Sequence, residues 1–193
     1  MDNVNRIVSS ETEELILVDA NDTEIGHLTK AGCHDGKGVL HRAFSLFLFN
    51  DAGELLLQQR GEEKRLWPGY WSNACCSHPR RGETMPVATC RRLRDELNIE
   101  ATLEFVYQFV YHAGFGDKGS ENELCHVYLG KTGIPVQPNE HEISAIRYIS
   151  VETLDGELKS MPEQFTPWFK MEWQTLQHEY SGSLASYCKQ AVC

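Results

Sequence analysis

The sequence predicts a mixed α+β fold, with a mixed β-sheet sandwiched by helices in a single compact domain. Two observations predict this class: short strand-like segments dominate the chain up to about residue 150, and helical segments interrupt them once and then close the chain. A chain of 193 residues can bury one substantial core. We expect an N-terminal extension over 1–13, the domain over 14–180 and a C-terminal tail over 181–193.

Hydrophobic patterning places the strands of the expected sheet. The segment 42–50 is apolar on both faces and is therefore expected to be a buried central strand. A turn at 50–53, with a glycine at its end, leads into the next strand as a hairpin. The expected strands are 14–20, 23–28, 42–50, 54–60, a short one around 71–75, 101–112, 122–130 and 144–150.

Three helices are expected. Thr84 can cap a helix that continues to about Leu97, with Pro86 tolerated in its first turn. Two further helices are expected at about 151–159 and 167–179. With the strands, these helices predict a mixed sheet flanked by helices.

Composition and charge exclude several classes of function. The net charge of −10 disfavours binding to nucleic acid or to an anionic membrane. No apolar run approaches the roughly 18–20 residues that span a bilayer. The first residues lack the basic and apolar regions of a secretory signal, so the seven cysteines are expected to be free thiols in a reducing cytoplasm.

Positive charge is concentrated in residues 60–94, which carry eight of the 18 Lys and Arg residues. A local basic zone in an acidic protein suits a small anion better than a long polyanion. The competing interpretation, a solvated run of surface charge, is expected to hold for about half of these residues.

Glu121 and Glu123 are two residues apart in an expected strand. Alternate strand residues point to the same face, so both carboxylates are expected on one side. Such a pair is unfavourable unless a cation or a proton lies between its members. The competing interpretation is a pair at a loop edge that faces water.

Three of the eight histidines, His34, His41 and His78, are candidates for the same site. His34 and His41 bracket a loop whose two glycines let it fold back on itself, and His78 ends a short strand. With Glu121 and Glu123 they would form a set of nitrogen and oxygen donors suited to Zn²⁺, Mn²⁺ or Mg²⁺. No compact HxxxH motif is present, so surface or packed histidines remain the alternative.

Arg92 and Glu96 are four residues apart in the expected central helix and share one face. As functional residues, Arg92 would bind an anion and Glu96 a metal, so that together they hold a metal-bound phosphate. The simpler interpretation is an exposed ion pair that contributes about 0.3–0.5 kcal/mol.

Cys75 and Cys76 are adjacent, so only one of them can line a pocket if both lie in a strand. His78 shares a face with Cys76, which is therefore counted with the metal-site residues. The remaining cysteines are expected to be inert packing thiols: Cys33, Cys90, Cys125, Cys188 and Cys193.

Taken together, these segments resemble type I isopentenyl diphosphate isomerase, a member of the Nudix superfamily. Any one matching stretch is weak, but the set runs in family order over roughly residues 14 to 170 and is highly specific. The stretches are KAGCH (30–34), LHRAFS (40–45), LLLQQR (55–60), WPG (67–69), NACCSHP (73–79), RRLRDEL (91–97), ENE (121–123) and TPWF (166–169).

The resemblance implies a Nudix-like fold and an isomerase that interconverts isopentenyl diphosphate and dimethylallyl diphosphate through a tertiary carbocation. Cys76 and Glu123 match the acid–base pair, with Tyr111 as an assistant of Glu123 and Trp168 over the hydrocarbon. Metal ligands are implied at His34, His41, His78, Glu121 and Glu123. Diphosphate-binding residues are implied at Lys30, Arg60, Lys64 and Arg92.

The same resemblance implies the cofactors and partners. One divalent ion, Mn²⁺, Zn²⁺ or Mg²⁺, would occupy the site of three histidines and two glutamates. A Mg²⁺ ion would bridge Glu96 and the substrate diphosphate, and neither flavin nor nicotinamide is expected. The expected partner is a small diphosphate, without nucleic acid or membrane, for a monomer or dimer in the cytoplasm.

The segment around Glu96 also resembles the Nudix box, with departures that bear on function. Glu83, Arg91 and Glu96 are kept, whereas Ser77, Arg92, Asp95 and Asn98 replace residues of that motif. Hydrolysis uses several carboxylates on this helix to hold metals and activate water, so Arg92 among them favours keeping the diphosphate intact. A Nudix-type diphosphate hydrolase is the alternative, and a noncatalytic metal-binding domain is a more distant one.

Overall fold

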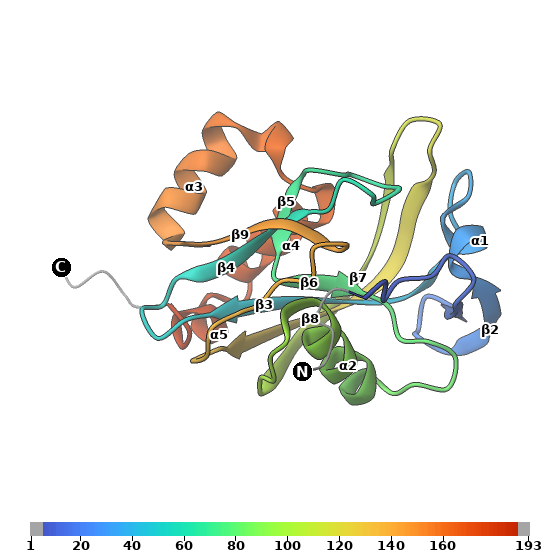
Figure 1. The fold of residues 1–193 in the computed structure, drawn as a ribbon, viewed down its shortest axis with the longest axis horizontal. Coiled ribbons are helices and arrows are strands. Elements are labelled where there is room, and N and C mark those ends of the chain that lie inside the picture. The colour runs from blue at the N-terminus through green and yellow to red at the C-terminus, as the bar shows by residue number, and fades with distance from the viewer. Residues whose placement is uncertain (1–5, 189–193) are drawn as a thin grey trace.

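The structure, a computed structural model, describes residues 6–188 and places nine strands in one mixed sheet (Figure 1). The predicted fold class is confirmed. The strands are β1 (Glu14–Val18), β2 (Glu24–Thr29), β3 (His41–Phe49), β4 (Leu55–Arg60), β5 (Trp71–Asn73), β6 (Cys75–Ser77), β7 (Leu103–Gly114), β8 (Ser120–Lys131) and β9 (Ile143–Ile149). The helices are α1 (Lys30–His34), α2 (Met85–Leu97), α3 (Val151–Ser160), α4 (Pro167–His178) and α5 (Ser181–Ala185), with a 3-10 turn, η1, at Pro162–Gln164.

Strand β3 is the centre of the sheet, as its two apolar faces predict. It pairs in parallel with β8 and antiparallel with β1, β4 and β6. Phe44 and Leu46 pack on one side with α2, whereas Phe47 and Phe49 pack on the other side with α3 and α4. The alternation follows because successive side chains of a strand point to opposite faces.

Helices cover both faces of the sheet. In Figure 1, α2 lies on one side of the central strands, and α3 and α4 lie on the other. No helix of residues 6–188 is long and apolar enough to span a bilayer. The sheet therefore has helices packed on both of its faces, with a hydrophobic cluster on each side.

The helix predicted from Thr84 to Leu97 is confirmed as α2, although the Thr84 side chain makes no capping hydrogen bond. The expected strand around 71–75 divides into β5 and β6, which pair with β4 and β3 respectively. The sequence did not predict α1, which has five residues and begins at Lys30, directly after the N-cap Thr29, whose hydroxyl accepts from the Gly32 amide. So short a helix has too few residues for a periodic pattern and depends on its cap and its packing.

Both ends of the described chain pack onto the rest of the molecule. Val8 is buried, and its carbonyl accepts hydrogen bonds from Arg80 and Arg92. At the other end, α5 lies within the segment expected as a tail, and its Leu184 is buried in the core under α4. The six cysteines among residues 6–188 are free thiols, and Cys193 lies outside the described residues.

Candidate active site

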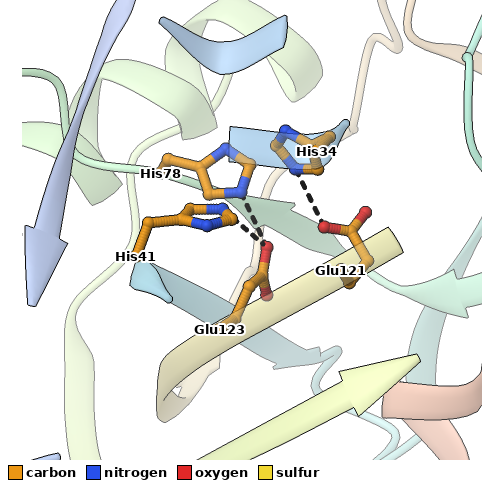
Figure 2. Close-up of side chains that lie close together, drawn as sticks. All are labelled: His34, His41, His78, Glu121 and Glu123. Carbon is orange, nitrogen blue, oxygen red and sulfur yellow. Dashed lines mark hydrogen bonds and ion pairs between the residues drawn. The ribbon is translucent and has the colours of Figure 1, made fainter. Parts of the chain in front are cut away.

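Five side chains predicted as metal ligands converge at one end of the sheet. One ligand atom from each of these residues lies within 4.8 Å of every other. Figure 2 shows the three imidazoles facing the two carboxylates, with Glu121 and Glu123 carried by the same strand, β8. Both glutamates are buried, so the interpretation of a water-facing loop pair is wrong. The cluster consists of His34, His41, His78, Glu121 and Glu123.

Strand register places Glu123 at the centre of this cluster. Across the parallel pair β3–β8, Glu123 is opposite His41, and across the antiparallel pair β7–β8 it is opposite Tyr111. Opposite residues in a sheet share a face, so His41 and Tyr111 flank Glu123 on either side. The Tyr111 hydroxyl donates to Glu123 Oε2 at 2.6 Å.

His34 reaches the cluster through a close backbone approach. It ends α1, and the residue that packs against its carbonyl is Gly119, just before β8. Gly119 has φ 137°, and a Cβ atom there would collide with the His34 carbonyl oxygen. Only glycine fits this position, which brings Glu121 Oε2 to 2.9 Å from His34 Nε2.

The donor set fits a divalent ion. The Nδ1 atoms of His34 and His41 lie 2.7 Å from the carbonyl oxygens of Lys30 and Val39, which fixes the tautomer and leaves each Nε2 facing the cluster. His41 Nε2 is buried and 3.6 Å from Glu123 Oε1, beyond hydrogen-bonding range. A buried nitrogen lone pair with no donor is the group that a metal ion satisfies.

Charge within the cluster shifts its pKa values in opposite directions. Burial opposes charging of His34, but the Glu121 carboxylate outweighs burial and raises the His34 pKa to about 9. Burial together with the charges of His41 and His34 holds the pKa of His78 well below its usual value. Burial opposes ionisation of Glu123, but the nearby His41 imidazole and the hydrogen bond from Tyr111 outweigh burial and lower the Glu123 pKa. The cluster therefore favours an ionised Glu123 with neutral and charged imidazoles around it.

Cys76 lies outside the metal-ligand cluster, and its sulfur makes its polar contacts elsewhere. The thiol donates to Asn73 Oδ1 at 2.8 Å, and the indole N–H of Trp168 donates to Cys76 Sγ at 3.1 Å. The hydroxyls of Ser45 and Ser72 lie 3.5 and 3.7 Å from the same sulfur. Burial, with a smaller effect of the Glu172 charge, raises the Cys76 pKa to about 12, so the group is a neutral thiol at neutral pH.

Cys76 and Glu123 line the same cavity, whose volume is about 240 Å³. Cys75 points the other way, into the core against Glu96, as expected for adjacent strand residues. Trp168 is buried beside Cys76, with its ring edge-on to Trp67 at 5.2 Å and its centroid 6.3 Å from Tyr111. The cavity thus places a thiol, a carboxylate and an aromatic wall around one space.

The predicted diphosphate-binding residues line this cavity as well, but each has an internal partner. Lys30 Nζ is 3.6 Å from Glu11, Lys64 pairs with Glu142, and Arg60 donates to the Leu66 and Trp67 carbonyls. Burial lowers the pKa of Lys64, and the Glu142 charge opposes that shift. Three of the four predicted residues are therefore paired with acids of the same chain, whereas Arg60 is held by backbone carbonyls.

Arg92 and Glu96 form a buried pair, so the interpretation of an exposed ion pair is wrong. Both side chains are nearly inaccessible, and Arg92 lies 2.6 Å from Glu96 and 3.3 Å from Glu142. Of this pair, Arg92 lines the cavity, and Glu96 is held behind it by Arg92 and the Cys75 thiol. A buried pair of this kind is costly to break, because the partner left behind has no counter-charge.

Sequence reasoning assigned no role to four residues that shape the site. Asn73, Ser45 and Ser72 surround the Cys76 sulfur, and Glu142 binds both Lys64 and Arg92. Asn73 lies in NACCSHP (73–79), one of the stretches that match the family, so the resemblance could have indicated a role for it. Glu142 lies before β9, in a segment without periodicity, and nothing local links it to α2.

Comparisons with known proteins show the family of this chain. Residues 39–169 match the family described as the NUDIX domain. A curated isopentenyl-diphosphate Delta-isomerase 1 from Photorhabdus laumondii is 41% identical over 174 residues, which cover 89% of this chain and 99% of that protein. An isopentenyl-diphosphate Delta-isomerase from Burkholderia multivorans is 44% identical, covering 81% of this chain and 89% of that protein.

Solved structures support the fold. A protein from Deinococcus radiodurans superposes with a TM-score of 0.63 at 23% identity, covering 77% of this chain and 90% of that chain. A MutT protein from Methanosarcina mazei Go1 superposes with a TM-score of 0.61 at 17% identity, covering 73% and 95%. The chain belongs to the Nudix family and, within it, to the isopentenyl-diphosphate Delta-isomerases.

Proposed function

We propose that this protein interconverts isopentenyl diphosphate and dimethylallyl diphosphate by adding a proton at one carbon and removing one from another. The observation that carries the proposal is that Cys76 and Glu123 line one cavity together with five Lys and Arg side chains. Moving an unactivated double bond requires an acid and a base on the same allylic unit. Binding of the diphosphate group requires cations nearby, which the basic side chains supply. The similar curated proteins are also named as this isomerase.

The protonation states of Cys76 and Glu123 support an assignment of acid and base for the forward reaction. The raised pKa of Cys76 keeps its proton on sulfur, whereas the lowered pKa of Glu123 keeps that carboxylate ionised. Starting from isopentenyl diphosphate, Cys76 gives its proton to the terminal alkene carbon and a tertiary carbocation forms. Glu123 then takes a proton from the neighbouring methylene, and the new double bond forms. The reverse reaction exchanges the two roles.

Tyr111 and Trp168 would support this chemistry in different ways. The Tyr111 hydroxyl donates to Glu123 Oε2 and orients the carboxylate. The Trp168 indole faces the cavity beside Cys76, where a ring face stabilises a nearby cation by about 2 kcal/mol when water is excluded. One such contact already exists, because the Arg60 guanidinium lies 5.1 Å from the Trp168 ring centroid.

His34, His41, His78, Glu121 and Glu123 would hold one divalent ion, Mn²⁺, Zn²⁺ or Mg²⁺. When bound, such an ion acts as a Lewis acid that lowers the pKa of nearby groups and fixes the orientation of its ligands. Glu96 would contribute to holding a Mg²⁺ ion on the diphosphate. Since Glu96 Oε1 now accepts from Arg92 and Cys75, that role exchanges one of these contacts for the ion.

Lys30, Arg60, Lys64 and Arg92 would bind the diphosphate. Glu11 pairs with Lys30, and Glu142 pairs with Lys64 and Arg92, so diphosphate binding would exchange these internal ion pairs for contacts with the external anion. Arg92 in the Nudix-box helix adds a positive charge where a hydrolase needs carboxylates for its catalytic metals. Isomerisation is therefore favoured over hydrolysis by the same cavity.

Incubation of the metal-loaded protein with isopentenyl diphosphate in deuterated water tests the proposal. We expect dimethylallyl diphosphate that carries deuterium, with no release of phosphate or pyrophosphate beyond the rate without protein. Release of phosphate without movement of the double bond would support the hydrolase. If neither reaction occurs and a diphosphate amine that mimics the cation does not bind, the chain is a noncatalytic metal-binding domain.

A further inference from the structure

One buried acid beneath the cavity has no role in the mechanism above. Glu172 lies on α4, one turn after Trp168, and its side chain is completely buried. Its Oε2 has no hydrogen-bond partner within residues 6–188, and no Lys, Arg or His of that range forms an ion pair with it. A buried, unpaired carboxyl is costly, and an apolar residue at this place would cost nothing comparable.

A chain of polar contacts links this carboxyl to the sulfur of Cys76. The Cys125 thiol lies 3.4 Å from Glu172 Oε1 and 3.5 Å from Ser45 Oγ. The same Ser45 hydroxyl lies 3.5 Å from Cys76 Sγ. Register accounts for the arrangement, because Ser45 of β3 is directly opposite Cys76 of β6.

Glu172 is expected to be a neutral acid at neutral pH. Burial raises its pKa to about 8, and hydrogen bonding by Ser45 and Cys125 offsets only part of that effect. The titratable groups that face it are Cys125 and Glu123 from β8 and Cys76 from β6, while the Tyr107 hydroxyl of β7 donates to its backbone carbonyl. None of these groups supplies positive charge, so ionisation of Glu172 leaves an uncompensated anion.

We propose that Glu172 is a positioning residue that acts on Cys76 through Ser45, and that turnover requires Glu172 in its neutral form. The inference rests on the proposed isomerase function and deepens it. When Cys76 gives its proton to the alkene, negative charge develops on sulfur. With Glu172 neutral, the Ser45 hydroxyl is free to donate toward that sulfur. With Glu172 ionised, Ser45 is drawn to the carboxylate, and a second negative charge opposes the one on sulfur.

The pH dependence of kcat for the metal-loaded enzyme tests this inference. We expect the wild-type kcat to fall about tenfold per pH unit above an apparent pKa near 8. Glu172→Gln keeps the shape of the side chain without an ionisable proton, so its kcat should show no fall over that range. The matched control is Glu179→Gln, an exposed glutamate at the end of the same helix, which should keep the wild-type profile.

A Glu172→Gln enzyme that retains the alkaline fall would overturn the inference, and so would a wild-type enzyme without that fall. Ser45→Ala provides a second variant that removes a single oxygen atom. It should lower kcat several-fold at neutral pH while KM changes by less than about twofold, because Ser45 acts on the reacting sulfur and not on the diphosphate. An unchanged kcat for Ser45→Ala would also overturn the inference.

Infrared spectroscopy separates this inference from the isomerase function itself. The difference spectrum of the resting protein between about pH 6 and about pH 10 should contain the carboxylic-acid band of a buried glutamic acid. That band should be absent from Glu172→Gln. If the wild-type protein isomerises nothing, the proposed function fails whatever the spectrum shows. If it isomerises and the band is missing, only the role of Glu172 fails.

Discussion

The indole nitrogen of Trp168 lies 3.1 Å from the sulfur of Cys76, and this contact joins α4 to β6 at the proposed reaction centre. The N–H group donates to sulfur, so under the proposed function it would stabilise the negative charge that forms when the thiol gives up its proton. Trp168 would then have two roles, a ring face toward the hydrocarbon and a donor toward the acid. The two roles can be separated by mutation.

Trp168→Phe should keep the aromatic face and lose the donor. We expect kcat to fall about 10- to 100-fold, which corresponds to one hydrogen bond to a charged group. Steady-state kinetics measure the change. Trp173→Phe is the matched control, because Trp173 is also buried on α4 but donates to Asp155, away from the cavity. Equal losses in the two variants would show a general packing effect instead.

Cys76→Ala should abolish turnover and leave the fold intact. Loss of a general acid or base typically costs about 10²- to 10⁴-fold in rate. Product formation from isopentenyl diphosphate measures the loss, and circular dichroism checks the fold. Cys90→Ala, a partly buried thiol on α2 that does not line the cavity, should remain active. Full activity in Cys76→Ala would refute its role as acid.

His41→Gln should reduce the bound metal to well below one ion per chain. His41 is fully buried within the donor set, and among residues 6–188 its Nε2 has no hydrogen-bond partner that could replace the ion. Elemental mass spectrometry of the purified protein gives the metal content. His178→Gln, at an exposed histidine in the last turn of α4, should bind as much metal as the wild type. A metal content of His41→Gln equal to that of the wild type would contradict the proposed five-ligand site.

Arg92→Met should destabilise the protein by about 3–5 kcal/mol, because it leaves Glu96 and Glu142 buried without a counter-charge. Arg94→Met, on the same helix, removes an exposed pair with Glu100 and should change the free energy of unfolding far less. Urea unfolding measures both free energies. Similar values for the two variants would mean that the Arg92 pair is effectively solvated.

The metal-free protein should lose a stabilising contribution of His34 as the pH rises. The ordinary pKa of histidine is 6.5, and that of His34 in the folded protein is raised to about 9 because the Glu121 carboxylate outweighs burial. The contribution is therefore fully present below about pH 6.5 and is lost by about pH 9. In chelator-treated samples, the difference in unfolding free energy between wild type and His34→Gln should shrink over this window. A difference that stays constant with pH would contradict the raised pKa.

Several features were predictable from the sequence because they depend on near neighbours along the chain. The two apolar faces of 42–50 predicted a central strand, and β3 occupies that place. The spacing of Glu121 and Glu123 predicted that their carboxylates share a face, since strand side chains repeat every two residues. The adjacency of Cys75 and Cys76 predicted that only one of them reaches a pocket.

What only the tertiary structure decided is which distant segments meet. The parallel register of β3 and β8 puts His41 opposite Glu123, and the approach of Gly119 to α1 brings His34 to Glu121. Register between strands about 80 residues apart depends on the packing of the whole core and leaves no local pattern. The same holds for Glu142 beside Arg92 and for Glu172 beneath Cys76. Chain geometry alone determines the direction of a side chain within its own strand, whereas its partner across the sheet is determined only when the complete core packs.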